Sequence, residues 1–402
     1  MKAKRFLAVI MASGGLWCTN LVAAELNDIF ETGKVNGNIR AYYNTREYDY
    51  RTDEGAFSLG GALRAETGSI SGIKFGVGYY TAQDLGTNDD DPAKVNTRLG
   101  SDLEVLGEAY VNLSGFNTAV TLGRQKINAP LANPGDAFII PFTFEAFSVV
   151  NTSIPKLTLQ LDHINEIKNR NSEEFVDVGE WSTLRYGIAS QETSGTTNLG
   201  AIYNANPLKL ELWLTRFDDL FDSIYLQGNY NFSGTETIKP FLGAQFVQQE
   251  DSGDSLLSTV DSTLYGVQAG ASMGKASLTL GYNTVAEEEG TFRNGAFLAP
   301  YSFSTSPIFT NNMLETFENV DSGDASKITF NYNFSPALAF KLSYATFDFN
   351  LAPDRDATDV DITYSFDEYW EGLSLRWRVE VVTSDTETVE QTNHRLQLQF
   401  VF

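Results

Sequence analysis

The chain ends on a stretch whose alternation defines a strand: Arg395-Leu396-Gln397-Leu398-Gln399-Phe400-Val401-Phe402. The side chains at 396, 398, 400 and 402 are apolar, and those at 395, 397 and 399 are polar. In an extended segment the two kinds therefore lie on opposite faces. A strand with one apolar face is prone to aggregate when its edge stays unpaired. We expect this strand to pair with another and to close a transmembrane β-barrel.

The first residues have the features of an export signal. Residues 1–5 are basic, residues 6–17 are apolar, and Val22-Ala23-Ala24 supplies the small side chains that a signal peptidase needs. We predict that residues 1–24 are a signal peptide and that residues 25–402 form the mature barrel domain. The only cysteine, Cys18, leaves with the signal, so the exported domain has neither a disulfide nor a thiol nucleophile.

Composition narrows the class of protein further. The formal net charge is −24, and the loss of Lys2, Lys4 and Arg5 with the signal makes the mature chain more acidic still. Nucleic acid is therefore not an expected partner, because its phosphates require basic surfaces. No later stretch is apolar enough for a membrane-spanning helix. The 33 glycines and 13% aromatic residues, without long apolar runs, favour many short strands.

The rest of the chain repeats the alternation of the last stretch. Residues 208–216, for example, place leucines on one face and Lys209, Glu211 and Trp213 on the other. We predict about eighteen such strands, at 35–46, 56–66, 73–83, 103–113, 118–125, 145–151, 157–163, 198–205, 208–216, 224–232, 239–248, 262–273, 276–284, 325–334, 338–349, 359–365, 372–382 and 392–402.

The connections between these strands alternate in length. Every second one is short, as at 67–72 and 274–275, and those between them are generally longer, as at 84–102, 126–144 and 285–324. Outer-membrane barrels have this layout, with short periplasmic turns and long extracellular loops, whereas the connections of a soluble β-sandwich do not sort in this way. The sequence therefore predicts an all-β fold, an antiparallel transmembrane barrel in the outer membrane of a Gram-negative bacterium.

Short motifs along the chain resemble a known family. Residues 122–127 (LGRQKI) and 141–146 (PFTFEA) resemble the third-loop region of OprD-type outer-membrane porins. Residues 375–378 (LRWR) and 395–402 resemble the last two strands of that family, and the order of strands and loops is similar over nearly all of residues 25–402. The major porins of campylobacter-like bacteria are a related resemblance, through the alternating first strand and the Arg-Leu-Gln ending.

The resemblance implies a fold and an activity. It implies a barrel of about 18 strands whose third loop folds into the lumen, with long fourth and seventh loops that help to close it. It also implies passive diffusion of small solutes, typically carboxylates or amino acids, guided by lumenal arginines and lysines. The acidity of this chain departs from that pattern and leaves the charge preference of the solute open.

The resemblance also implies the partners of such a protein. They are outer-membrane lipid, lipopolysaccharide, small solutes and the barrel assembly machinery, which would recognise the C-terminal strand. Porins are often trimers, so a homotrimer is one arrangement to expect, although lipid-facing and subunit-facing strands are both apolar.

The polar face of the predicted strands carries basic side chains that we expect to line the pore. They are Arg40, Arg64, Lys341, Arg376, Arg378 and Arg395. If the last strand pairs with the first, the five arginines lie on four neighbouring strands. This arginine wall could pass a carboxylate along by successive bidentate contacts. It could equally neutralise inward acids such as Glu66 and Glu380, and both interpretations stay open.

Two acids are candidates for the opposite side of the constriction. The resemblance places an acid of the family at Glu145, after Thr143-Phe144, and Asp136 lies earlier in the same region. Acids facing a positive wall would create a transverse field that orients dipolar solutes. For Asp136, which follows Asn133-Pro134-Gly135, turn chemistry is the alternative explanation.

No motif in the sequence predicts catalysis or a cofactor. His163 and His394 have no serine nucleophile motif beside them, and the sequence has no phosphate-loop, zinc or Gly-x-Ser-x-Gly pattern. The acidic runs at 89–91, 251–254 and 287–289 should be solvated or hold calcium loosely, without forming a specific metal site.

Two classes of function follow from the sequence. The first is a porin, a passive channel for small hydrophilic solutes and ions whose arginine wall faces acidic residues of a constriction loop. The second is a mainly structural or adhesive outer-membrane protein whose acidic surface loops are bridged by divalent cations. The position of residues 126–144 separates the two, because inside the barrel this loop would narrow a pore.

Overall fold

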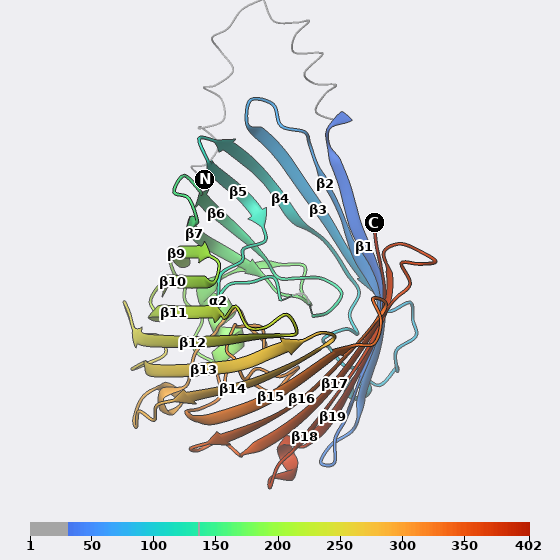
Figure 1. Cartoon of the computed structure of the whole chain (residues 1–402), viewed down its shortest axis with the longest axis vertical. Helices are drawn as coiled ribbons and strands as arrows, with labels where there is room; N and C mark the ends of the chain where they lie inside the picture. The colour runs from blue at the N-terminus through green and yellow to red at the C-terminus, as the bar shows by residue number, and fades with distance from the viewer. Residues whose placement is uncertain (1–30, 136) are drawn as a thin grey trace, which may run out of the picture.

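The computed structural model describes residues 31–135 and 137–402, so the predicted signal peptide and Asp136 lie outside the described residues. The described strands form one antiparallel sheet that closes on itself (Figure 1). They are β1 (Lys34–Glu47), β2 (Glu54–Glu66), β3 (Ile73–Gln83), β4 (Leu103–Gly115), β5 (Thr118–Gln125), β6 (Thr143–Asn151), β7 (Leu157–Lys168), β8 (Phe175–Asp177), β9 (Thr196–Ala205), β10 (Leu208–Phe217), β11 (Phe221–Asn231), β12 (Ile238–Asp251), β13 (Asp261–Met273), β14 (Ala276–Val285), β15 (Gly323–Asn333), β16 (Leu338–Phe349), β17 (Arg355–Ser365), β18 (Leu373–Thr383) and β19 (Gln391–Val401).

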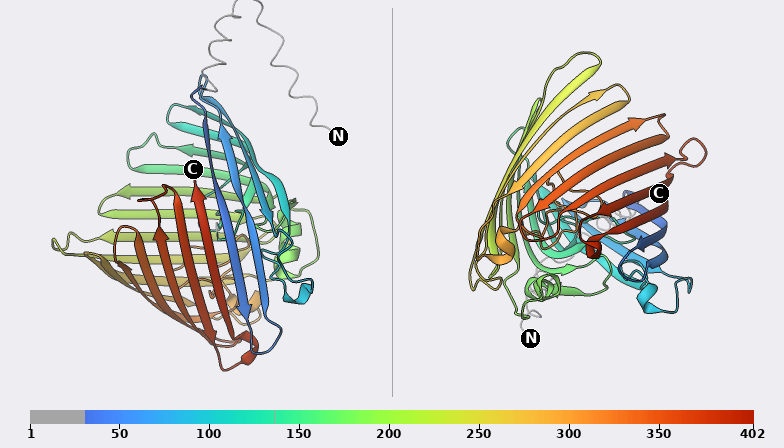
Figure 2. Two further views of the ribbon diagram at one scale, coloured as in Figure 1. Left: turned by 90° about the vertical axis from the view of Figure 1, so that its right-hand side faces the viewer. Right: turned by 90° about the horizontal axis from the view of Figure 1, so that it is seen from below.

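Eighteen of the described strands build the wall of the barrel. The short β8 pairs only with the last residues of β7 and is not part of the closed ring. β1 and β19 close the ring, with Ile39 opposite Phe400 and Arg40 opposite Gln399 (Figure 2). Gly37 and Phe402 exchange backbone hydrogen bonds of 3.0 and 3.1 Å. The terminal strand therefore closes the barrel, and the predicted fold class is confirmed.

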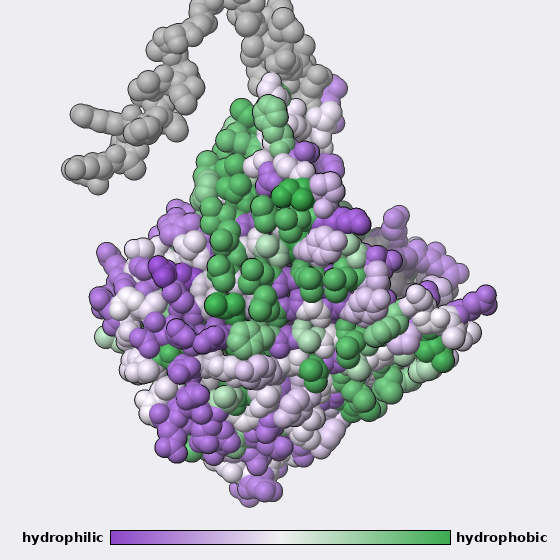
Figure 3. Space-filling view, turned by 60° about the vertical axis from the view of Figure 1, so that its left-hand side comes forward, coloured by the Kyte–Doolittle hydropathy of each residue, from purple (hydrophilic) through white to green (hydrophobic). Residues whose placement is uncertain are grey.

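The outer surface of the wall is apolar, and its inner surface is polar. In β19, Leu396 and Leu398 on one face are 43% and 42% exposed, whereas Arg395 on the other face is 3% exposed. This is the reverse of a water-soluble protein, and it is what a wall surrounded by lipid requires. On the face drawn in Figure 3, apolar side chains gather in patches over the wall, with hydrophilic side chains around them. No helix among the described residues is long and apolar enough to cross a membrane.

Three long connections leave the same end of the barrel and carry little regular structure. They are the third loop (residues 126–142), the fourth loop (169–195) and the seventh loop (286–322). The fourth loop contains α2 (Val178–Tyr186), whose first turn is capped by the Asp177 carboxylate on the Gly179 amide at 2.7 Å and which ends at Gly187, with φ 73°. Shorter helical turns in the described part of the chain lie at Pro92–Lys94, Phe292–Gly295 and Glu387–Val389.

Candidate functional site

Apolar side chains from the three long loops fill much of the lumen at the long-loop end. Phe142 of the third loop, Trp181 of the fourth, and Phe297 and Tyr301 of the seventh are buried in one cluster with Phe217 of β10. Burying a side chain of this size contributes about 2 kcal/mol. The cluster therefore holds the loops against each other and against the wall, inside the barrel.

The third loop crosses the lumen and reaches the first strand. The backbone oxygen of Phe138 accepts a hydrogen bond from the Arg40 guanidinium, and that of Ala137 accepts one of 3.1 Å from the Tyr42 hydroxyl. Arg40 and Tyr42 both lie on the lumenal face of β1, where they are 7% and 1% exposed. Residues 137–138 consequently lie inside the barrel, and they narrow its opening.

A cavity of about 180 Å³ remains between the loops and the wall. Its lining comes from β1, β19 and the second loop (residues 84–102), as well as from the third, fourth and seventh loops. The charged residues that line it, among those described, are Arg46, Arg98, Arg170, Arg185, Arg395, Glu315 and Glu318. The cavity is thus the place where all the inward loops meet the wall, and cations outnumber acids around it.

Arginine and phenylalanine side chains alternate along one side of this cavity. The guanidinium carbons of Arg395 and Arg170 lie 5.3 and 4.7 Å from the ring centre of Phe138. Those of Arg170 and Arg185 lie 4.8 and 4.3 Å from the ring centre of Phe303. At such distances a cation is attracted to the face of a ring, by about 0.5–2 kcal/mol. The order Arg395–Phe138–Arg170–Phe303–Arg185, hereafter the arginine–phenylalanine stack, joins β19 to all three loops.

Arg170 is the most isolated charge of the stack. It is 7% exposed, and within residues 31–135 and 137–402 no side chain forms an ion pair or hydrogen bond with its guanidinium. Burial, with a smaller contribution from Arg395, lowers the pKa of Arg170. Arginine nevertheless stays protonated in proteins. A buried positive charge that no carboxylate contacts is costly, so an anion in the cavity would stabilise this arrangement.

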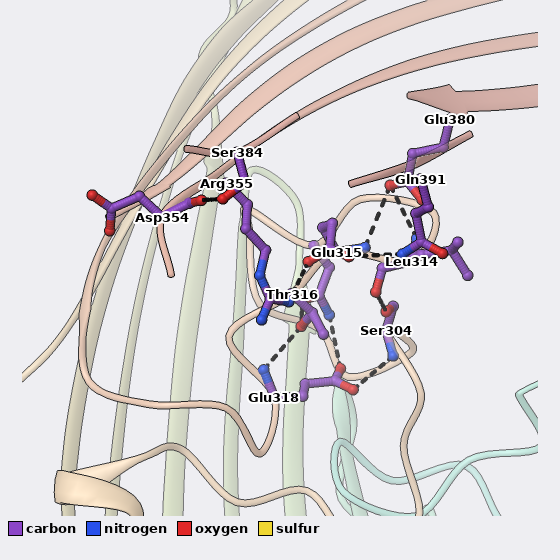
Figure 4. Close-up of polar contacts among 11 residues, drawn as sticks. Ser304, Leu314, Glu315, Thr316, Glu318, Asp354, Arg355, Glu380, Ser384 and Gln391 are labelled. Atoms are coloured by element: carbon purple, nitrogen blue, oxygen red, sulfur yellow. Dashed lines mark hydrogen bonds and ion pairs between the residues drawn. The ribbon is translucent and has the colours of Figure 1, made fainter. Parts of the chain in front are cut away.

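The two glutamates beside the cavity already have partners. The Glu318 carboxylate accepts hydrogen bonds from the amides of Ser304 and Ser306 at 2.7 and 2.8 Å. Glu315 forms a 2.8 Å ion pair with Arg355 of β17. Figure 4 shows these residues around the seventh loop. Because both carboxylates bind the loop to itself or to the wall, the arginines dominate the charge that a solute would meet.

The predicted basic residues lie on the lumenal face. Three of them form one row across the wall together with an aspartate. Lys341 on β16 is opposite Asp361 on β17, which is opposite Arg378 on β18, which is opposite Arg395 on β19. Arg376 binds both oxygens of Asp361, and Arg378 lies 3.5 Å from the same carboxylate. Arg378 and Arg395 are directly opposed like charges, which repel each other. The net charge of the row is positive, because it contains three basic side chains and one acidic one.

Arg40 and Arg64 lie outside this row and contact other side chains. Besides its contact with the third loop, Arg40 donates a 2.6 Å hydrogen bond to Gln399. Arg64 lies 2.6 Å from the Glu108 carboxylate, which Lys126 also approaches to 3.5 Å. Arg64 is therefore paired with an acid of the wall, which agrees with the alternative that these arginines neutralise inward acids.

Glu145 does not belong to the third loop. It lies in β6 opposite Arg124 of β5, and the two side chains form a 3.3 Å ion pair. Phe147, two residues further on the same face, is 36% exposed on the outer side of the wall. The expectation that Glu145 is a constriction acid is therefore wrong, because the strand already begins at Thr143 and turns it outward. Asp136 lies outside the described residues, and its role stays a prediction.

Sequence reasoning missed four of the arginines that line the cavity. Arg46 lies on the same face of β1 as Arg40, so the alternation of that strand could have found it. Arg98, Arg170 and Arg185 lie in loops. No periodic signal exists there, and only the packing of the loops brings these three side chains to one cavity.

Neither histidine lies at the cavity. His163 contacts Thr197 at 3.0 Å, and His394 lies 3.8 Å from Glu47, both on the outer face of the wall. In the described part of the chain, no group of three histidine, cysteine, aspartate or glutamate side chains could hold a metal ion.

A closed antiparallel barrel with an apolar exterior and a lumen narrowed by inward loops defines the class of protein: an outer-membrane porin. The sequence matches the family described as "outer membrane porin, OprD family" over residues 30–401. The chain therefore belongs to the OprD family. The predictions of this family and of a Gram-negative outer-membrane location are confirmed.

Solved structures of similar fold include porins of Pseudomonas and Acinetobacter. Pseudomonas aeruginosa OccK9 (OpdG) is 20% identical, with a TM-score of 0.78 over 93% of this chain and 99% of that one. Acinetobacter baumannii OccAB3 is 18% identical, with a TM-score of 0.79 over 93% and 100%. P. aeruginosa OpdK, solved with vanillate, is 17% identical, with a TM-score of 0.75 over 93% and 99%. No curated protein matches the chain.

Proposed function

We propose that this porin is a passive diffusion channel for small hydrophilic solutes and ions, and that it favours solutes with a carboxylate. The observation that carries the proposal is Arg170, buried beside the cavity with no acidic partner among the described residues. Guanidinium groups bind carboxylates in bidentate fashion. Arg46, Arg98, Arg185 and Arg395 would receive or release the same group as the solute moves past them.

The stack also supports an aromatic or other planar body for the solute. Phe138 and Phe303 line the cavity together with the arginines, so a flat apolar group could lie beside their rings while its carboxylate binds a guanidinium. Vanillate, found with the similar P. aeruginosa OpdK, is an aromatic carboxylate. We extend that chemistry to this chain as a proposal.

The geometry lends less support to a mainly structural or adhesive protein. That alternative would leave the third loop outside the barrel, whereas residues 137–138 contact lumenal side chains of β1. The acidic runs at 89–91, 251–254 and 287–289 stay expected to be solvated or bridged loosely by calcium.

Solute uptake into proteoliposomes tests the proposal. Benzoate and benzyl alcohol have similar size and differ in charge. We expect benzoate to enter faster through the wild type, and Arg170→Gln to slow benzoate about tenfold without slowing benzyl alcohol. Arg216→Gln removes the same charge from an exposed ion pair with Asp222, away from the cavity, and serves as the control. Equal rates for both solutes in the wild type would contradict the proposal.

Three further properties are proposed on the strength of the family. The family consists of channels, and we infer that this chain catalyses no reaction and needs no cofactor. We also infer that the barrel assembly machinery binds the C-terminal strand, whose side chains at 396, 398, 400 and 402 face outward. A homotrimer stays a prediction.

A further inference from the structure

The tip of the seventh loop (residues 311–315) is held against the wall by two carboxylates. The amide of Met313 donates a 3.0 Å hydrogen bond to Asp359 of β17. The amides of Leu314 and Glu315 donate hydrogen bonds of 3.1 and 3.3 Å to one oxygen of Glu380 of β18 (Figure 4). Three consecutive backbone amides of the loop are thus bound by acids of the barrel.

The two acids form a buried pair. Asp359 and Glu380 are directly opposite each other on neighbouring strands, and they are 4% and 0% exposed. Each binds the loop through one oxygen, and the other oxygen of each is buried without a hydrogen-bond partner in the described part of the chain. Two ionised carboxylates in this position repel each other. The charge that the pair carries must therefore depend on pH.

Charged groups face the pair from every neighbouring element. They are Lys327 of β15, Lys341 of β16, Arg378 of β18, Arg395 of β19 and Glu315 of the seventh loop. Burial is the largest influence on the pair and opposes its ionised form, as Glu315 does, whereas the cations favour that form. Glu315 is itself bound to Arg355.

Neutral contacts complete the attachment of the tip. Ser343 of β16 donates a 2.9 Å hydrogen bond to the Asn312 side chain, which donates one of 3.2 Å to the backbone oxygen of Ala357. Met313 and Leu314, which the acids hold, also line the cavity. Because the tip forms one side of the cavity, its departure from the wall would change the width of the pore.

We propose that Asp359 and Glu380 form an acid-sensitive latch, which holds the tip of the seventh loop in the pore and releases it when the pair is protonated. A carboxylate accepts a charge-assisted hydrogen bond from an amide, and a neutral carboxylic acid accepts a weaker one. Protons from the solvent therefore weaken all three amide contacts together. Acidification shifts the loop towards a released state with a wider pore, whichever solute the channel favours.

Single-channel recording of the full-length porin in planar bilayers tests the latch. Between about pH 9 and about pH 4, we expect the wild type to visit a level of higher conductance about ten times more often. The double variant Asp359→Asn/Glu380→Gln should show that level already at neutral pH and lose the pH response. Heat-modifiable migration on a gel verifies that the variant barrel is folded.

Two controls make the experiment decisive. Asp361→Asn removes the same charge from the same face of β17, but Asp361 binds Arg376 and Arg378, so it should keep the wild-type pH response. Asn312→Cys/Ser343→Cys, joined by a short bifunctional thiol reagent, should hold the tip and abolish the acid-induced level. The latch is overturned if the double carboxylate variant keeps the wild-type pH response, or if the cross-linked channel still shows the acid-induced level.

Discussion

At the scale of residues, the arginines of the lumen differ in how far their charge is already neutralised. Arg64 and Arg376 each have a close carboxylate, on Glu108 and Asp361 respectively. Arg170 and Arg395 instead lie beside phenylalanine rings. A ring attracts a cation without cancelling its charge, so these side chains can still attract an anion from solution.

Removing the charge of Arg378 should reduce any preference for anions. Arg378 lies next to Arg395 in the charged row. Arg378 and Arg376 share a single contacting carboxylate, that of Asp361. We expect Arg378→Gln to lower the ratio of anion to cation permeability about twofold, measured as the reversal potential under a salt gradient. Arg216→Gln, on the outer face, should leave the ratio unchanged. If Arg378→Gln behaves like this control, the row does not set selectivity.

Replacing Glu145 should have little effect on transport. Its ion pair with Arg124 is on the outer face, with the two side chains 43% and 38% exposed. Exposed ion pairs contribute up to about 1 kcal/mol. We expect Glu145→Gln to leave conductance and reversal potential at their wild-type values. A clear change in ion selectivity would return Glu145 to the constriction and contradict its outward position.

The alternation of side chains predicts which strand residues face the lumen, but it does not predict which loop residues reach the cavity. The basic residues from Arg40 to Arg395 were assigned to the inner face from a period of two, and the register places them there. For Glu145 the family motif and the alternation with Phe147 disagree, and the register of β6 follows the alternation. The arginines at 98, 170 and 185 had no local signal, since only tertiary contacts bring them together.

At the scale of elements, the wall strands were predicted with the correct order, and their loop-side ends were too short. β7 continues to Lys168 instead of 163, and β12 continues to Asp251 instead of 248. In β12 the added residues 249–251 are all polar, so the alternation disappears while the backbone pairing with β11 continues. In β7 the register with β6 shifts at Glu145 and Ala146, so that Ile164 and Ile167 both join the buried core and the period of two is broken. α2 was missed for a related reason, because its position depends on the packing of Trp181 against Phe142 and Phe303.

Glu318 should determine the internal order of the seventh loop. Its carboxylate binds the amides of Ser304 and Ser306, and hydrogen bonds to a charged group contribute about 1.5–3 kcal/mol each. We expect Glu318→Ala to speed hydrogen exchange at these two amides by about a hundredfold. Glu318→Gln keeps an acceptor and should restore part of the protection. Unchanged exchange in the alanine variant would show that other contacts order this loop.

At the scale of the whole molecule, one pair of strands converts a sheet into a channel. β1 and β19 pair along their lengths, and Phe402 hydrogen-bonds to Gly37 at the very end. The stretch that begins at Arg395 therefore closes the barrel with one face and supplies an arginine to the cavity with the other. Its alternation predicted the closure, whereas its contact with Phe138 depends on the fold of the third loop.

The last residue should matter more for assembly than for the stability of the finished barrel. We expect Phe402→Ser to reduce the amount of folded porin in outer membranes several-fold, because it removes an outward apolar group that the assembly machinery would bind. Val401→Ala, on the neighbouring position of the other face, is the control. Gel migration before and after heating measures the folded amount. Equal amounts for Phe402→Ser and wild type would contradict this role.

The central claim, a channel whose arginines favour carboxylate-bearing anions, is tested most directly by the reversal potential of the wild-type porin in a planar bilayer. The measurement uses a gradient of potassium benzoate across the membrane. We predict a stable conductance and a reversal potential whose sign shows that benzoate passes more readily than potassium. A potential of the opposite sign, or the absence of any conductance, would contradict the claim.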